Sequence, residues 1–137
     1  LAMLRVATHK GDYDDTIITL FRKYFLPLQD AATGLVRGGY RGSGDGYGSG
    51  NSMTPIQWAS TEHNVDLFQS LVLLGKTFRD DNAKEFSAMY EKIGRGLDKY
   101  MWDDSYGTFN RGYRFEKGAD EAKALDCASW GVLYLVK

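Results

Sequence analysis

The chain has 137 residues, a length that fits one ordinary domain. Its formal net charge is −1, and its lysines and arginines are scattered, which argues against a nucleic-acid surface. No apolar run is long enough to span a bilayer, and no signal peptide is visible. The compartment therefore stays open, a secreted or periplasmic location included if the N-terminus is truncated.

Cysteine and histidine usage bounds the chemistry further. Cys127 is the one cysteine, so it forms no disulfide within the chain, and its apolar helical run predicts a small core residue rather than a nucleophile. Two histidines without a spaced Cys/His set give no metal motif. The sequence predicts neither a metal nor a cofactor.

Hydrophobic periodicity predicts helices over most of the chain. Two of these helices carry one apolar stripe and are mostly polar on the rest of their surface. Two others are apolar nearly all round. We expect a helix end over 1–7, amphipathic helices over 12–26 and 82–101, and buried helices over 60–78 and 124–135.

The connecting segments carry turn and strand signals. A turn over 29–34 leads into a short extended segment over 35–40, and a turn at Gly107 leads into another over 108–113. Between Gly38 and Gly50 there are seven glycines in thirteen residues, interleaved with aromatic and charged residues. This segment is either a flexible linker or a functional loop.

These pieces recur in the same order. Asp30, Gly34 and Tyr40 are followed at an offset of 73 residues (113 − 40) by Asp103, Gly107 and Tyr113. Each copy lies between an amphipathic outer helix and an apolar inner helix. A repeat of helical hairpins builds a solenoid or a closed α/α toroid, and the long period favours the toroid. The sequence thus predicts an all-α fold of two to three hairpins, with residues 1–137 as a single partial domain of a larger toroid.

The stretch from Trp58 to Phe68 concentrates the polar side chains. Ser60 or Thr61 is a natural N-cap, which places Glu62, His63 and Asn64 in the first helical turn. Polar groups at the start of a buried helix suggest a pocket. The plainer alternative is that Glu62 is only a cap and dipole partner.

Three motifs carry a resemblance to a known fold. They are Trp58-x-Ser60-Thr61-Glu62-His63-Asn64-x-Asp66, the Asp/Gly turn leading to Arg111-Gly112-Tyr113, and Leu125-Asp126-x-x-x-Trp130-Gly131. Together they resemble segments of six-hairpin, (α/α)6-toroid glycosidase-like proteins. The resemblance implies glycoside chemistry, although lyases, epimerases and terpenoid enzymes share that fold.

The resemblance and the residue types give the candidate site. In a toroid the starts of inner helices face one cavity, so Glu62 is the expected general acid and Asp126 the expected general base. For Asp126, helix capping or an ion pair with Arg111 is the alternative. Aromatic rings for stacking and polar groups for hydroxyls complete the predicted substrate-binding set: Trp58, His63, Asn64, Asp66, Tyr40, Tyr47, Arg37, Tyr113 and Arg111.

Three functions remain open at this level. The first is a glycoside hydrolase, or a fragment of one, acting on an oligo- or polysaccharide. The second is a carbohydrate-binding protein without turnover. The third is a structural or assembly role, in which the rest of the toroid, copies of the chain or a partner chain cover the inner helices.

Overall fold

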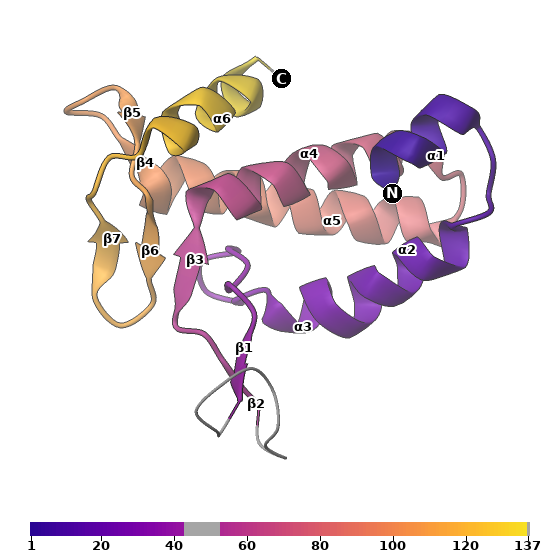
Figure 1. Cartoon of the computed structure of the whole chain (residues 1–137), viewed down its shortest axis with the longest axis horizontal. Coiled ribbons are helices and arrows are strands. Elements are labelled where there is room, and N and C mark those ends of the chain that lie inside the picture. Colours follow the sequence, from indigo (N-terminus) through magenta and orange to yellow (C-terminus); the bar gives the residue numbers. More distant parts are fainter. Residues whose placement is uncertain (43–52, 137) are drawn as a thin grey trace.

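The computed structural model describes residues 1–42 and 53–136 (Figure 1). The described part is 57% helical and 15% strand, and its strands form three small antiparallel sheets. The helices are α1 (Ala2–Thr8), α2 (Asp14–Leu20), α3 (Leu26–Leu28), α4 (Thr61–Thr77), α5 (Asp81–Gly96) and α6 (Leu125–Leu135). The strands are β1 (Tyr40–Gly42), β2 (Met53–Pro55), β3 (Trp58–Ser60), β4 (Trp102–Asp103), β5 (Thr108–Phe109), β6 (Gly112–Arg114) and β7 (Gly118–Asp120).

The prediction of an all-α fold is therefore wrong, and the fold is mixed α and β. Helical periodicity identified the helices, but it says nothing of how the connecting segments pair their backbone groups. Buried N–H and C=O groups need partners, and here the segments between helices supply them to one another as strands. Three strands, β3, β6 and β7, form the largest of the sheets in the described residues.

Helix α4 lies at the centre of the molecule. It runs along α5, while α6 and α1 pack on its other sides (Figure 1). Its buried positions face the core and include Val65, Phe68, Leu71 and Leu74. The Ser60 side chain caps its start by accepting a hydrogen bond from the backbone N–H of His63 at 3.4 Å.

The sequence also predicts that α6 is buried nearly all round, and the structure differs. Cys127, Gly131 and Tyr134 are buried on one face of α6. Leu125 is 87% exposed, and Val132, Leu133 and Leu135 are exposed as well. Only one side of α6 is covered within the described chain.

The 73-residue repeat is present in the backbone geometry. Each outer helix ends in a π-helical turn, Phe21–Phe25 after α2 and Leu97–Met101 after α5. The bridge between Gln29 and Val36 recurs as the pairing of Trp102 with Phe109. Each turn between these partners contains a glycine with positive φ, Gly34 at 76° and Gly107 at 59°. The two copies thus share the same backbone geometry from the π-helical turn to the strand pairing that follows it.

The two copies differ in the length of the segment that leads to α4 in the first copy and to α6 in the second. Gly38 donates its N–H to Trp58, and its counterpart Arg111 donates to Ala122. The first segment therefore spans 20 positions (58 − 38), and the second spans 11 (122 − 111). Because the whole difference lies in these segments, Glu62 and Asp126 occupy equivalent positions in the first turns of α4 and α6.

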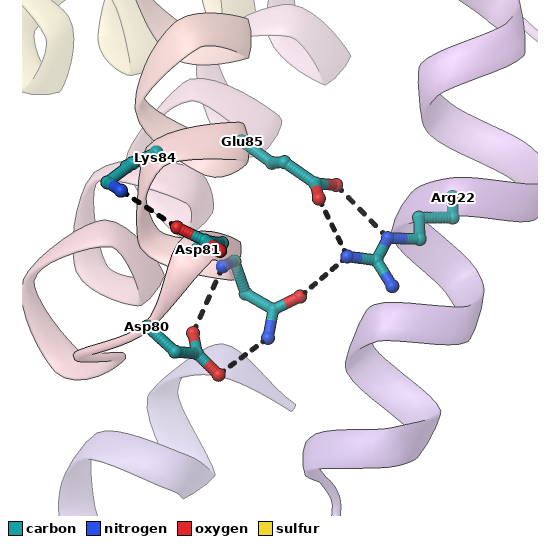
Figure 2. Close-up of polar contacts among 6 residues, drawn as sticks. Arg22, Asp80, Asp81, Lys84 and Glu85 are labelled. Carbon is teal, nitrogen blue, oxygen red and sulfur yellow. Dashed lines mark hydrogen bonds and ion pairs between the residues drawn. The ribbon is translucent and has the colours of Figure 1, made fainter.

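A polar network joins the outer helices (Figure 2). Arg22 forms two hydrogen bonds with the Glu85 carboxylate, at 3.0 and 2.7 Å, and a third with the Asn82 side chain at 2.9 Å. This hydrogen bonding lowers the pKa of Glu85. Asp80 caps α5 by accepting hydrogen bonds from the backbone and the side chain of Asn82 at 3.0 and 2.8 Å. The start of α5 is thereby fixed to the outer helix of the preceding repeat.

The repeat provides a matched pair of glycine substitutions. A Cβ at Gly34 would lie 2.3 Å from the Lys92 carbonyl oxygen, whereas a Cβ at Gly107 would meet nothing within 4 Å. Gly107→Ala should cost about 1 kcal/mol for the left-handed backbone alone. Gly34→Ala should cost about 2 kcal/mol more, because the carbonyl must move. Urea unfolding of both variants measures the difference, and equal losses would contradict the tight approach at Gly34.

The cap of α5 gives a second stability prediction. Asp80→Ala removes the acceptor for the first turn of α5 and should lower the free energy of unfolding by about 1 kcal/mol. Asp81→Ala is the control, since Asp81 is exposed and pairs with Lys84 at the surface. It should change stability by less than about 0.5 kcal/mol. Thermal and urea unfolding check both, and a larger loss at Asp81 would refute the capping role of Asp80.

Candidate functional site

The sheet of β3, β6 and β7 positions polar residues near the starts of α4 and α6. Trp58 is paired with Arg114, and Ser60 with Gly112, which in turn is paired with Asp120. Alternate residues of a strand share a face. The register therefore places Trp58, Arg114 and Asp120 on one face, around Gly112.

Trp58 lies across Gly112. A Cβ at Gly112 would be 2.7 Å from the indole Nε1 and 2.8 Å from Cε2 of Trp58. Any side chain at this position would displace the ring, so the glycine makes room for it. The indole N–H is buried and finds no hydrogen-bond partner among the described residues.

Two arginines share one buried carboxylate beside this ring. Arg111 donates to Asp120 Oδ2 from Nε and Nη2, at 3.2 and 2.8 Å, and Arg114 donates from Nη2 at 3.3 Å. The Asp120 side chain is 8% exposed, and each arginine side chain is 47% exposed. The Arg111 hydrogen bond and the positive charges of both arginines lower the pKa of Asp120. Asp120 is therefore held as a carboxylate that orients the two guanidinium groups.

These residues line an open cleft of about 510 Å³. This volume lies within the range of small-molecule sites, roughly 300–1,000 Å³. Arg41 from β1, together with Ile56 and Gln57 before β3, forms the remaining wall. We call this space the Trp58 cleft; it is lined by Arg41, Ile56, Gln57, Trp58, Arg111, Arg114 and Asp120.

The starts of α4 and α6 meet at the backbone carbonyl of Arg111. Thr61 donates its N–H to this oxygen at 3.1 Å, and the Cys127 thiol donates to it at 3.7 Å. The Arg111 side chain reaches the Trp58 cleft. One residue thus connects both helix starts with the cleft.

The two predicted catalytic carboxylates flank this meeting point. Glu62 is half-buried and follows Thr61, while Asp126 is exposed and precedes Cys127. Burial raises the pKa of Cys127 to about 11, and the negative charges of Asp126 and Glu62 contribute. Both carboxylates therefore lie close enough to the Cys127 thiol to affect its pKa, at one end of the molecule. Asp126 Oδ1 accepts a hydrogen bond from the Cys127 N–H at 2.8 Å, and the Arg111 side chain pairs with Asp120 instead.

Two of the predicted substrate-binding residues, Asn64 and Arg37, connect structural elements to one another. Asn64 is 1% exposed; its Oδ1 accepts from the Val36 N–H at 2.8 Å, and its Nδ2 donates to the carbonyls of Val36 and Ser60. Both Nδ2 hydrogens and one acceptor site of the Asn64 amide are thus used within the chain. Arg37 pairs with Asp30 at 2.7 Å, hydrogen-bonds Gln57, and stacks over the Phe115 ring at 3.8 Å.

Arg37, His63 and Asn64 also line one pocket of about 200 Å³, and the remaining predicted binding residues are dispersed. His63 and Asp66 are exposed and line an apolar groove of about 350 Å³ between α1, α2 and α4, away from the Trp58 cleft. Tyr40 is half-buried against the core. Tyr113 lies on the opposite face of its strand from Arg114 and packs against Tyr100 and Phe115. Tyr47 lies outside the described residues.

Four polar residues of the cleft are not among those predicted from the sequence: Arg41, Gln57, Arg114 and Asp120. A usable signal existed for the last two. The turn Glu116-Lys117-Gly118 joins two short extended runs, which is typical of a β-hairpin. Antiparallel pairing across that turn places Asp120 opposite Gly112, next to Arg114.

Comparison with known proteins adds no relative. No protein-family model, curated protein or solved structure matches this chain. Within residues 1–42 and 53–136, no group of His, Cys, Asp and Glu side chains could hold a metal ion. In the same ranges, every helix is too short or too polar to cross a membrane.

The lowered pKa of Asp120 predicts that the stability of the fold depends on pH. Its pKa is lowered in the folded chain, so its contribution is complete above the ordinary Asp pKa of about 4 and is lost as the pH falls through the lower folded value. Asp120→Asn should therefore reduce the free energy of unfolding by about 1 kcal/mol at pH 7, since its partners are half-exposed. The difference should shrink toward pH 2.5.

Urea unfolding between pH 2.5 and pH 7 measures this difference. Asp15→Asn is the control, because Asp15 is exposed on α2. A deficit in Asp120→Asn that stays constant with pH would contradict an electrostatic role for the carboxylate.

Proposed function

We propose that this chain is a carbohydrate-active protein of the glycoside hydrolase type. It binds a saccharide in the Trp58 cleft and uses Glu62 and Asp126 as its acid and base. The observation that supports this most is that both carboxylates stand in equivalent first turns of α4 and α6, whose starts share the Arg111 carbonyl. Paired carboxylates are the usual machinery of glycosidic bond cleavage.

The lining of the Trp58 cleft suits a sugar. A pyranose ring has apolar C–H faces that pack on an aromatic ring, and its hydroxyls take hydrogen bonds from charged side chains. Trp58 supplies the ring, and Arg41, Arg111 and Arg114 supply N–H donors. A mostly apolar ring with a few fixed polar groups around it is typical of small-molecule sites.

The two carboxylates suit different steps. Glu62, which is half-buried, acts as the acid that gives a proton to the glycosidic oxygen as the bond to the anomeric carbon breaks. Asp126, exposed to solvent, takes a proton from the water that adds to that carbon. The water thereby supplies the new hydroxyl and restores one proton to the protein.

A second function, saccharide binding without turnover, is favoured by one observation. Neither Glu62 nor Asp126 is among the residues that line the Trp58 cleft. Asp126 also uses one carboxylate oxygen to accept the N–H of Cys127. In this case both carboxylates only stabilise the first turns of their helices, and the Trp58 cleft binds the saccharide without cleaving it.

Turnover of a glycan panel distinguishes the two functions. For an enzyme, Glu62→Gln and Asp126→Asn should each lower kcat by about 100-fold or more, because each removes a proton-transfer group. Glu91→Gln, which removes an exposed carboxylate on α5, is the control and should leave kcat unchanged. Trp58→Ala should weaken saccharide binding by about 10-fold through loss of stacking and apolar contact.

Each outcome is informative. Saccharide binding that depends on Trp58, without any turnover, would select the binding protein. Turnover that survives Glu62→Gln would refute the acid assignment. If no glycan of the panel binds in calorimetry, the saccharide proposal fails altogether.

A further inference from the structure

We infer that the Trp58 cleft selects an acidic saccharide, one whose sugar carries a carboxylate. This inference rests on the proposed function and narrows its substrate class. The geometry that points to it is the gathering of three arginines around a single tryptophan ring, with one carboxylate between them.

The charge balance of the cleft is positive. Arg41, Arg111 and Arg114 contribute three guanidinium groups, and Asp120 is the one acidic residue among those that line it. Asp120 compensates one positive charge, so the lining carries a formal charge of +2. The chain as a whole carries −1, so this positive charge is local. An anion entering the cleft would be attracted by it.

Asp120 also leaves much of each guanidinium group available. A guanidinium has five N–H donors in a fixed fork. Arg114 uses one of its nitrogens, Nη2, for Asp120, and Arg111 uses Nε and Nη2. Both side chains remain 47% exposed, while the carboxylate that orients them is buried. The other N–H groups are therefore held in place for a second planar anion, and a carboxylate matches the fork of an arginine in a bidentate pair.

Arg41 adds a third positive charge to the lining of the cleft. It is exposed on β1, and among the described residues its side chain has no ion-pair partner. Trp58, Arg41 and the Arg111–Arg114 pair line the same cleft. A sugar ring packed on the indole would carry its carboxylate toward one of these arginines.

The test compares acidic oligosaccharides with their methyl esters. Oligogalacturonate, oligoglucuronate and oligomannuronate are each titrated in the free-acid and the methyl-ester form by calorimetry at two salt concentrations. The ester keeps the ring and the length but removes the charge. We expect at least one free acid to bind about 10-fold more tightly than its ester, as charged hydrogen bonds do. The ratio should fall as the salt concentration rises.

Two variants locate the preference. Arg114→Gln and Arg41→Gln should each reduce the acid-to-ester ratio about threefold or more, because the affinity for the acid loses the charge attraction and the affinity for the ester loses at most a neutral hydrogen bond. Arg41→Gln disturbs no ion pair of the described structure, so it tests the charge even if Arg114→Gln folds poorly. Arg95→Gln, which removes an exposed arginine of α5, is the control and should keep the ratio.

The outcomes separate this inference from the proposed function. Equal affinity for acid and ester, or for neutral oligosaccharides, would overturn the acidic specificity and leave saccharide binding intact. Binding of nucleoside monophosphates as tight as that of the best uronate would overturn it in favour of a general anion site. The absence of any saccharide binding would remove both.

Discussion

The structure depends on the pairing of β3 with β6, which brings together segments that are more than fifty residues apart in the chain. This pairing sets Trp58 against Arg114 and Ser60 against Gly112. It also delivers the Arg111 carbonyl to the N–H of Thr61, so α4 begins where β6 begins. Isolated strands of three residues are too short to be stable. Their stability here comes from the helices that they connect, and in return they fix where those helices start.

The electrostatics of the cleft follow from the same pairing. The turn after β6 returns the chain as β7 and places Asp120 beside Gly112. Because the carboxylate is buried between two half-exposed arginines, it remains ionised and holds both in position. Gly112 is needed at the centre, since the Trp58 ring occupies the space that any side chain would fill. The backbone register thus fixes both the position of the Trp58 ring and the orientation of the two arginines.

Local signals in the sequence predicted local structure well. The helices, the Ser60 cap and the repeated Asp/Gly turn lie near where their patterns indicated, because each depends on residues within a few positions. The all-α prediction was wrong because strand pairing joins segments that are distant in the sequence. Helical periodicity carries no information about such pairing. Asn64 shows the same limit. A polar residue in the first turn of a helix suggested a ligand contact, but its three hydrogen bonds bind a loop segment 28 residues earlier and the preceding turn.

The unequal length of the two repeats has a consequence for how this protein can vary. The segment from Gly38 to Trp58 spans 20 positions and its counterpart from Arg111 to Ala122 spans 11, and yet equivalent hydrogen bonds close both segments. Doubling the length of a flexible connection costs only about 0.6 kcal/mol in closure entropy. A change in the number of residues between Gly38 and Trp58 should therefore cost little free energy of folding, provided that the hydrogen bond between these two residues is kept.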